Sequence, residues 1–597
     1  MTSRQSSSRG ATLGELSPLN PPISPARTTT TRLLRRIDEL RGAYGGDAAL
    51  RKLELLGVLD RRTLRSPRAL VRLHEFLCFL RAYPDNQAVF DQTERMLAGF
   101  EHRPDLRRHR AALAGTGIAG TVIEEVFFWF TAQWLARRWP DRITIDWKDF
   151  RSKAELVELL HLMLPYSETP ALDEFAFPLR TWLTRLKGPS ETDAAFLIRR
   201  FEALHHSSFG RETLYERIGI PLVLAPGPGT PSRTRAKYPS GPPVFQSRPL
   251  DRSRPSLVTA IRKPPLAVRS VPPAEADQLI GLAREAMVTR ARDLDNFIHA
   301  DRNDVRMFDY GDGLTFACFG LMPERRLLLE SVYGMLTLKN GVPIGYVLAS
   351  GLFGSSEVMY NVFETYRGGE AARIYGCVLS MVRSLFGADT FAVDPFQLGH
   401  GNREGQESGA FWFYYKLGFR PVDRRVRRLV REERHRLRRN PHGRSSPRTL
   451  QKLSAEYVFL HTAGPRRDVL GQVSLGNIGL HVSRLLAERV GGERERGVRA
   501  CSREAARLVD AQSLEGWSTG ERLAWERWSP LILALQHVER WPLRDRRALA
   551  RVVRAKGGRR ESDFVTLFDG HRRLRRAMLL LATSQPEPPA GHPVVGS

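Results

Sequence analysis

Residues 367–372, with the sequence RGGEAA, have the composition of a turn that binds an anion. Glycine lacks a Cβ atom, so the backbone at Gly368 and Gly369 can approach a phosphate closely. The turn precedes a segment with helical periodicity, and the N-terminus of a helix favours negative charge. Arg367 adds a cation. Glu370 favours the alternative, an ordinary strand-to-helix connection, because its carboxylate repels a diphosphate.

The segments around this turn have the periodicities of a small α/β unit. Two apolar runs flank Asn340-Gly341, which predicts a hairpin because both turn positions need positive φ. A third strand is predicted at 357–366, and a helix follows the turn and stops at Gly387. A strand at 390–399, a short helix at 408–418 and a strand at 419–422 complete the unit. Upstream, 256–271 predicts a first strand, 273–297 one or two helices, and 314–321 a further strand.

Two motifs in this unit resemble those of the GNAT superfamily of acetyl-CoA-dependent N-acyltransferases. The first is the pyrophosphate turn, commonly R/Q-x-x-G-x-G/A; Arg367 and Ala372 match it, while Glu370 stands where a glycine is usual. The second is A-x-x-x-Y-x-x-x-G-F on a helix that leads into a strand. Its positions are occupied by Ala410, Tyr414, Gly418 and Phe419. Glu407 stands at a position where the family often has asparagine.

The resemblance implies a role for each matching residue. Acetyl-CoA or another acyl-CoA would be the donor, and an amine on a small molecule or a protein would be the acceptor. The third strand would pair with the pantetheine arm and direct a backbone N–H at the thioester, and the turn would wrap the pyrophosphate. The implied cofactor-binding residues are Val362, Phe363, Arg367, Gly368, Gly369, Ala371 and Ala372. Tyr414 would protonate the departing thiolate, although a tyrosine on so aromatic a helix is more often part of the core.

Acyl transfer also needs a base that deprotonates the amine. Glu364 on the third strand and Asp394 near the end of the next strand are the candidates. Asp394 can instead cap the turn before Pro395. His400 and Glu404 lie in a polar, glycine-rich loop, where a rigid scaffold often places functional side chains. The residues do not decide among these candidates.

The positive charge of the chain indicates which classes of partner it could bind. The net charge of +27 attracts phosphates, nucleic acid, anionic membranes or acidic proteins, although charges spread over solvated helices explain it more simply. Residues 424–448 concentrate arginine, whose planar fork matches phosphates. That segment is therefore a candidate contact for nucleic acid or another anionic partner, and the alternative is a solvated helix followed by a linker at Asn440-Pro441.

The predicted location is the cytoplasm, without a membrane span. The N-terminus lacks the apolar segment of a secretory signal. The most apolar window, 120–138, contains Glu124 and Glu125, which favours a buried helix of a soluble domain. The four cysteines are widely spaced and are interpreted as buried apolar residues in a reducing compartment.

The N-terminal helices contain one candidate metal site. Glu158 with His161, and Glu202 with His205, have the Glu-x-x-His spacing of a di-iron bundle, and Glu124 or Glu125 would add a ligand. Helices rich in these residues give this spacing by chance far more often, so no metal is expected.

The predicted fold class is a multidomain α and α/β protein, in which a GNAT-like mixed β-sheet with helices is flanked by two all-α domains. The boundaries are a disordered tail at 1–30, an all-α domain at 31–224, a Pro/Gly/Arg-rich linker at 225–256, the acyltransferase-like domain at 257–423, the arginine-rich segment at 424–448, an all-α domain at 449–584 and a disordered tail at 585–597. The favoured function is N-acyl transfer. The alternatives are a catalytically inactive CoA-binding scaffold, favoured by Glu370, and a nucleic-acid-binding protein.

Overall fold

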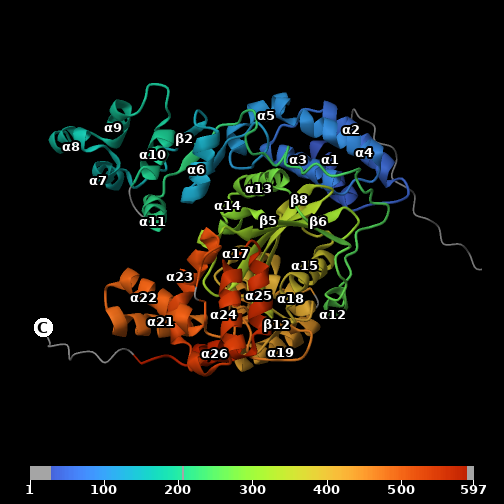
Figure 1. The fold of residues 1–597 in the computed structure, drawn as a ribbon. Helices are drawn as coiled ribbons and strands as arrows, with labels where there is room; N and C mark the ends of the chain where they lie inside the picture. The colour runs from blue at the N-terminus through green and yellow to red at the C-terminus, as the bar shows by residue number, and fades with distance from the viewer. Residues whose placement is uncertain (1–28, 205–207, 441, 512, 588–597) are drawn as a thin grey trace, which may run out of the picture.

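The computed structural model describes residues 29–204, 208–440, 442–511 and 513–587. The predicted mixture of helix and sheet is confirmed, with a nine-stranded sheet in the order β11-β12-β10-β9-β8-β7-β6-β5-β4 (Figure 1). All neighbouring strands are antiparallel except β9 and β10. The strands are β4 Ala267–Ser270, β5 Ala300–Asp309, β6 Leu314–Leu321, β7 Ser331–Lys339, β8 Val342–Leu352, β9 Ser355–Val362, β10 Thr390–Val393, β11 Arg420–Pro421 and β12 Val458–His461.

The predicted hairpin and helix in the centre of the unit are confirmed. Asn340 and Gly341 have φ of 50° and 76° and join β7 to β8. Helix α15, Ala371–Phe386, ends at Gly387, which takes the left-handed conformation with φ 69°. Its apolar face packs on the sheet, because positions three and four apart lie on one side of a helix. The turn at 367–372 is therefore held between a strand and a long helix.

The central part contains further helices besides α15. The predicted one or two helices after the first strand are α13, Pro273–Val288, and α14, Asp295–Ile298. The remaining helices are α12 Leu257–Ala260, α16 Pro395–Leu398, α17 Arg403–Ser408, α18 Ala410–Lys416, α19 Arg424–Arg439 and α20 Pro447–Leu453, with the 3-10 helix η5 Glu364–Tyr366 after β9.

The N-terminal part is not all-α. It has two apolar cores, one under α1–α5 and one under α6–α11, and the second core includes a three-stranded sheet in the order β1-β3-β2. The strands are β1 Ile123–Glu125, β2 Ile143–Ile145 and β3 Leu222–Leu224. The helix predicted across 120–138 was therefore wrong in its first half. Residues 123–125 pair with β3, distant in sequence, and tertiary pairing overrides local periodicity in so short a segment.

The helices of this part follow the predicted periodicity elsewhere. They are α1 Thr30–Arg41, α2 Ala48–Arg61, α3 Pro67–Ala82, α4 Gln87–Ala98, α5 Pro104–Arg108, α6 Trp129–Arg138, α7 Lys153–Met163, α8 Thr169–Glu174, α9 Leu179–Leu186, α10 Asp193–Glu202 and α11 Ser208–Ile218. The tails predicted at 1–30 and 585–597 lie outside the described residues apart from 29–30 and 585–587, and α1 already begins at Thr30.

Residues 225–256 contain no helix and no strand, as expected of a linker, but their first half is not solvated. Thr234 is buried; its hydroxyl lies 2.8 Å from His74 Nε2, and its carbonyl accepts from Arg81 Nη1 at 2.6 Å. The N–H of Tyr238 donates to Gly341 O at 2.8 Å. The segment has no apolar periodicity of its own, so its burial depends on polar partners in α3 and in the β7–β8 hairpin.

The C-terminal part is neither all-α nor a separate core. Strand β12 inserts between β10 and β11, and Trp525, Trp528 and Phe564 share one apolar core with the central sheet. A buried ion pair joins Lys556 to Glu561 at 2.6 Å. The helices of this part are α21 Leu475–Val490, α22 Arg494–Leu508, α23 Thr519–Ala534, α24 Leu543–Lys556, α25 Glu561–Gly570 and α26 Arg572–Thr583, and α25 packs on β7 and β8 (Figure 1).

Among the described residues, no helix is both long enough and apolar enough to cross a membrane. Cys78, Cys318 and Cys501 are buried and Cys377 is half-buried, and all four are free thiols.

Candidate active site

The strands β9 and β10 separate and leave a cavity between them. They pair only from Ser355 to Glu357, while β9 stays paired with β8 as far as Val362. The side-chain amide of Gln397 spans the gap and donates to Tyr360 O at 2.9 Å and to the Tyr414 hydroxyl at 3.2 Å. The resulting space, called here the strand cavity, has about 250 Å³ and is lined by residues 360–362, by the turn at 367–371 and by residues between 397 and 414.

The backbone N–H groups of Val362 and Phe363 point in different directions. The N–H of Phe363 donates to Ile344 O at 3.0 Å, and the Phe363 side chain is buried under Arg290. Because backbone directions alternate along a strand, the N–H of Val362 points away from β8, into the gap. Val362 lines the strand cavity, whereas the prediction that Phe363 binds a cofactor is not supported, since its N–H is already used.

The glycine turn lies at the mouth of the strand cavity. Gly368 has φ 81°, a conformation that suits glycine, and no atom lies within 4 Å of the position of a Cβ there. None of the described residues accepts a hydrogen bond from the backbone N–H groups of residues 368–372. Gly368 and Ala371 line the strand cavity, and Gly369 and Ala372 line the cleft next to it. The turn thus presents unpaired donors at the N-terminus of a 16-residue helix.

Glu370 does not face either space. Its Oε1 accepts from Arg373 Nη1 at 3.1 Å, and its Oε2 lies 3.7 Å from Nζ of the buried Lys339. The carboxylate is itself buried, with 7% of its residue surface exposed. The departure from the family pattern at this position therefore places no negative charge where a diphosphate would lie.

Arg367 is held by an acidic side chain from the loop that the sequence indicated as a place for functional residues. Its guanidinium donates to Glu404 on α17, and Glu404 also pairs with Arg292 at 3.1 Å. Partial burial would raise the pKa of Glu404, but the charges and hydrogen bonds of Arg292 and Arg367 outweigh it and hold that pKa below the ordinary value. Glu404 is therefore a carboxylate that neutralises the cavity's cations rather than a base.

Tyr414 lines the strand cavity from α18 and is buried, with 2% exposed. Burial raises its pKa, and the hydrogen bond from Gln397 opposes this only in part. The phenol therefore stays protonated at neutral pH. Its oxygen accepts from Gln397, which leaves its O–H free to donate.

The two predicted bases lie in different surroundings. Glu364 is exposed on η5 rather than on the strand, and it does not line the cavity. Asp394 caps α16, accepting from Gln397 N at 3.1 Å, which is the alternative role predicted for it. Burial raises the pKa of Asp394, and its Oδ2 is buried without a partner. Neither lines the cavity that holds Tyr414.

Glu357 on β9 was missed by sequence reasoning. It lies where the two strands begin to separate, and the hydroxyl of Tyr457 donates to its Oε2 at 3.3 Å. Burial, together with the charges of Asp394 and Glu330, raises its pKa to about 7. A carboxylate with that pKa can take up a proton at neutral pH. The available signal was an acidic residue at the start of a predicted strand whose next six side chains are apolar or neutral.

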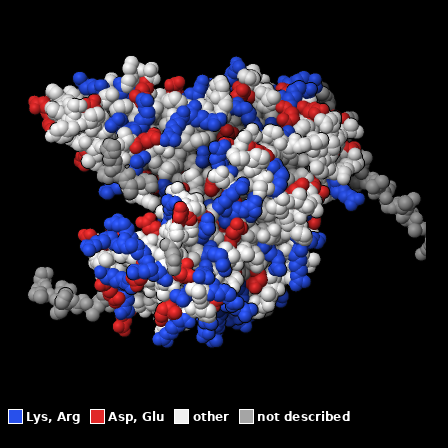
Figure 2. Space-filling view, viewed as in Figure 1, with Lys and Arg blue, Asp and Glu red and all other residues white. Residues whose placement is uncertain are grey.

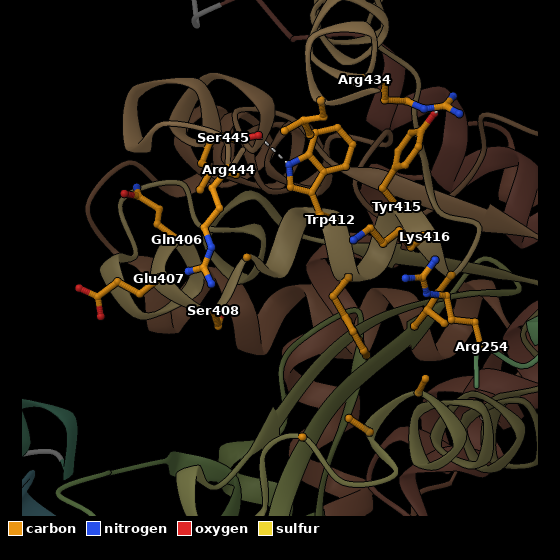
Figure 3. A pocket seen from close by; sticks show the side chains of 18 of the residues that line it. Arg254, Gln406, Glu407, Ser408, Trp412, Tyr415, Lys416, Arg434, Arg444 and Ser445 are labelled. Carbon is orange, nitrogen blue, oxygen red and sulfur yellow. Dashed lines mark hydrogen bonds between the residues drawn. The ribbon is translucent and has the colours of Figure 1, made fainter. Parts of the chain in front are cut away.

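A large basic cleft adjoins the strand cavity, and the two share Gly368, Ala371, Ser408 and Phe413. It has about 1560 Å³. In Figure 3, Arg444 and Glu407 lie on one side of Trp412, and Lys416, Arg434 and Arg254 lie on the other. Its cationic side chains are Arg252, Arg254, Arg403, Lys416, Arg420, Arg434, Arg438 and Arg444. Glu407, the only carboxylate in the lining, pairs with Arg403 at 2.7 Å, so the cleft carries a large excess of positive charge.

The residues of the di-iron hypothesis do not gather. His161 lies 3.0 Å from Asp173, Glu202 pairs with Arg137, and Glu124 stands on a strand. His205 lies outside the described residues. Across the part of the chain that is described, no three His, Cys, Asp or Glu side chains lie close enough to hold a metal ion.

Comparisons of the chain with protein-family models, with curated proteins and with solved structures found no match.

Proposed function

We propose that the chain transfers an acyl group from acyl-CoA to an amine. One observation carries the proposal: the strand cavity opens into the basic cleft directly across the N-terminus of α15. A narrow cavity suits the pantetheine arm, and a cationic cleft suits the phosphates of the nucleotide end. The order of elements from β4 to β11 also follows the order that the GNAT resemblance implies, with two extra short helices, α16 and α17, before α18.

The residues present fit acyl-CoA on chemical grounds. The unpaired N–H groups of residues 368–372 and the cations of the basic cleft match a diphosphate. Glu370 faces Lys339 and Arg373 instead of the cleft. Acyl-CoA supplies an activated carbonyl, and the protein has only to bind it, stabilise the charge that develops and move protons.

Three groups have chemistry that suits these tasks. The N–H of Val362 points into the gap and can donate to an oxygen that becomes negative. Glu357 does not line the strand cavity, but it can accept a proton from the amine through water, because its pKa is near 7. Tyr414 can donate a hydrogen bond to the leaving sulfur. Because its pKa is raised, stabilising the thiolate by a hydrogen bond is favoured over complete proton transfer.

The first experiment is calorimetric titration of the full chain with acetyl-CoA. We expect micromolar binding that weakens by about tenfold or more in Arg367→Glu, because a charge-assisted contact to phosphate is replaced by repulsion. Arg383→Glu is the matched control, since Arg383 is an exposed arginine in the last turn of α15, at the opposite end of that helix from the turn. No binding by folded protein, or equal loss in both variants, would contradict the proposal.

Release of free CoA thiol in the presence of amines then tests the chemistry. A protein that binds acetyl-CoA and shows no release with any amine tested would be the CoA-binding scaffold. Glu370 no longer favours that alternative, because its carboxylate is turned away from the cleft.

A further inference from the structure

Helix α19 separates its buried residues from a row of arginines. Arg424, Arg427, Arg428 and Arg431 recur at the i, i+3, i+4, i+7 spacing of one helix face. Val426, Val430 and Glu433 are buried on the other face. The helix is therefore fixed to the protein body by one side, and its arginines are presented outward.

These four arginines line a groove of about 550 Å³ together with Arg420 and Tyr415, called here the arginine groove. No carboxylate lines it. None of the four forms an ion pair with any carboxylate of the described residues, and the buried Glu433 pairs instead with Arg436 at 2.6 Å. In Figure 2, Lys and Arg atoms gather along the lower edge of the molecule, where Figure 1 places α19 and α26.

The arginine groove continues into the basic cleft. Tyr415 and Arg420 line both, and the guanidinium of Arg434, on the cleft side, donates to the Tyr415 hydroxyl at 3.2 Å. Unpaired positive charge thus extends from the cleft along more than two turns of α19. A surface of this length can contact several phosphates in a row.

The chemistry of the surface favours one class of partner. Anchoring to a membrane surface or to an acidic protein needs large apolar side chains next to the charges. No large apolar side chain of α19 is exposed. Binding to a polyelectrolyte needs none, because the release of counterions from phosphates supplies the free energy. The net charge of +27 would also attract such a partner over long distances.

We propose that the arginine groove binds the phosphate backbone of a nucleic acid without regard to base sequence. The proposal goes beyond acyl transfer and does not depend on it, because none of the four arginines lines the basic cleft or the strand cavity.

The test uses the full chain with Arg424, Arg427, Arg428 and Arg431 all changed to Gln. Fluorescence anisotropy is measured with labelled RNA and DNA single strands of about 16 nucleotides, and with a DNA duplex, over a series of salt concentrations. We expect at least tenfold weaker binding, and a slope of log K against log salt that falls by about 3 for four lost phosphate contacts on a single strand. The RNA, DNA and duplex arms identify the form that is bound.

A matched control removes the same charge elsewhere. Arg494, Arg496, Arg499 and Arg503 on α22 are exposed and form no ion pair with a described residue, and all four are changed to Gln. This variant should keep both the affinity and the slope. Equal losses in the two variants would mean that net charge alone attracts nucleic acid, which overturns the proposal, as would unchanged binding in the α19 variant.

Two further measurements separate nucleic-acid binding from binding of a membrane or of acyl-CoA. Vesicles of phosphatidylglycerol that bind through the α19 arginines, with no nucleic-acid binding, would assign the groove to membranes and overturn the proposal. Acetyl-CoA titration of the α19 variant should give the wild-type affinity. Loss of acyl-CoA binding there, with nucleic-acid binding intact, would show that the groove serves the acyl donor instead.

Discussion

The strand cavity and the basic cleft share a boundary but differ in whether their charged side chains are paired. In the strand cavity the polar groups engage one another: Arg367 and Arg292 hold Glu404, and Gln397 holds Tyr414. In the basic cleft most cations have no carboxylate partner. Groups that are already hydrogen-bonded to each other are fixed in position, which suits chemistry, whereas unpaired cations suit attraction of a polyanion. We therefore expect changes at Glu357 and Tyr414 to alter turnover. Changes to the cations of the cleft, or to Arg367 and its partner Glu404, are expected to alter affinity.

The largest effect is expected for Glu357→Gln. Loss of a general base lowers kcat by about a hundredfold or more at neutral pH, with little change in the Kd of acetyl-CoA. Wild-type kcat/KM should rise with pH through about 7, because Glu357 must be deprotonated to accept a proton, and this limb should vanish in the variant. Glu364→Gln, at the exposed position favoured by the sequence, is the control. Inactivity of that control with an active Glu357→Gln would reverse the assignment.

In the cleft, Arg254→Glu combined with Arg444→Glu should raise the Kd of acetyl-CoA by about tenfold or more. The reason is that charge-assisted contacts to phosphate are replaced by repulsion. Turnover at saturating acyl-CoA should stay close to wild type. Steady-state kinetics separates the two quantities. A fall in kcat with an unchanged Kd would remove the distinction drawn between cleft and cavity.

Tyr414→Phe should lower kcat by about tenfold, because one hydrogen bond to the leaving sulfur is lost. The Kd of acetyl-CoA should hardly change. Tyr415→Phe provides the comparison, since the Tyr415 hydroxyl meets Arg434 on the cleft side rather than the cavity. If Tyr414→Phe turns over at the wild-type rate, Tyr414 is a core residue with no part in the reaction.

The smallest effect is expected for Glu404→Gln, in the wall of the strand cavity. Its carboxylate competes with any anion for Arg367, and ion pairs of this exposure contribute about 0.2–1 kcal/mol. The Kd of acetyl-CoA should therefore fall by a factor of about 1.4–5. Weaker binding instead would mean that Glu404 positions Arg367 rather than competing for it.

Local signals predicted much of the central unit. Asn340-Gly341 gave the hairpin because few other pairs adopt positive φ at both positions. Periodicity and Gly387 gave α15. The turn at 368–372, with Arg367 and Tyr414, was predicted from motifs, and these residues do lie around adjoining spaces. Each of these features depends on residues that are close together in the chain.

By itself, the sequence determined the β7–β8 hairpin and α15, because propensity, periodicity and turn chemistry act over a few residues. The strands predicted at 256–271 and 390–399 were wrong in part, since α12 and α16 form within them. Tertiary structure alone decided that residues 123–125 form a strand, that β12 enters the sheet and that residues around Thr234 are buried. It also decided the charges of the site, since Glu370 turns toward Lys339, Glu404 holds Arg367, and Glu357 acquires a raised pKa. Strand pairing and pKa values depend on partners that lie far away in sequence, and only the folded chain brings those partners together.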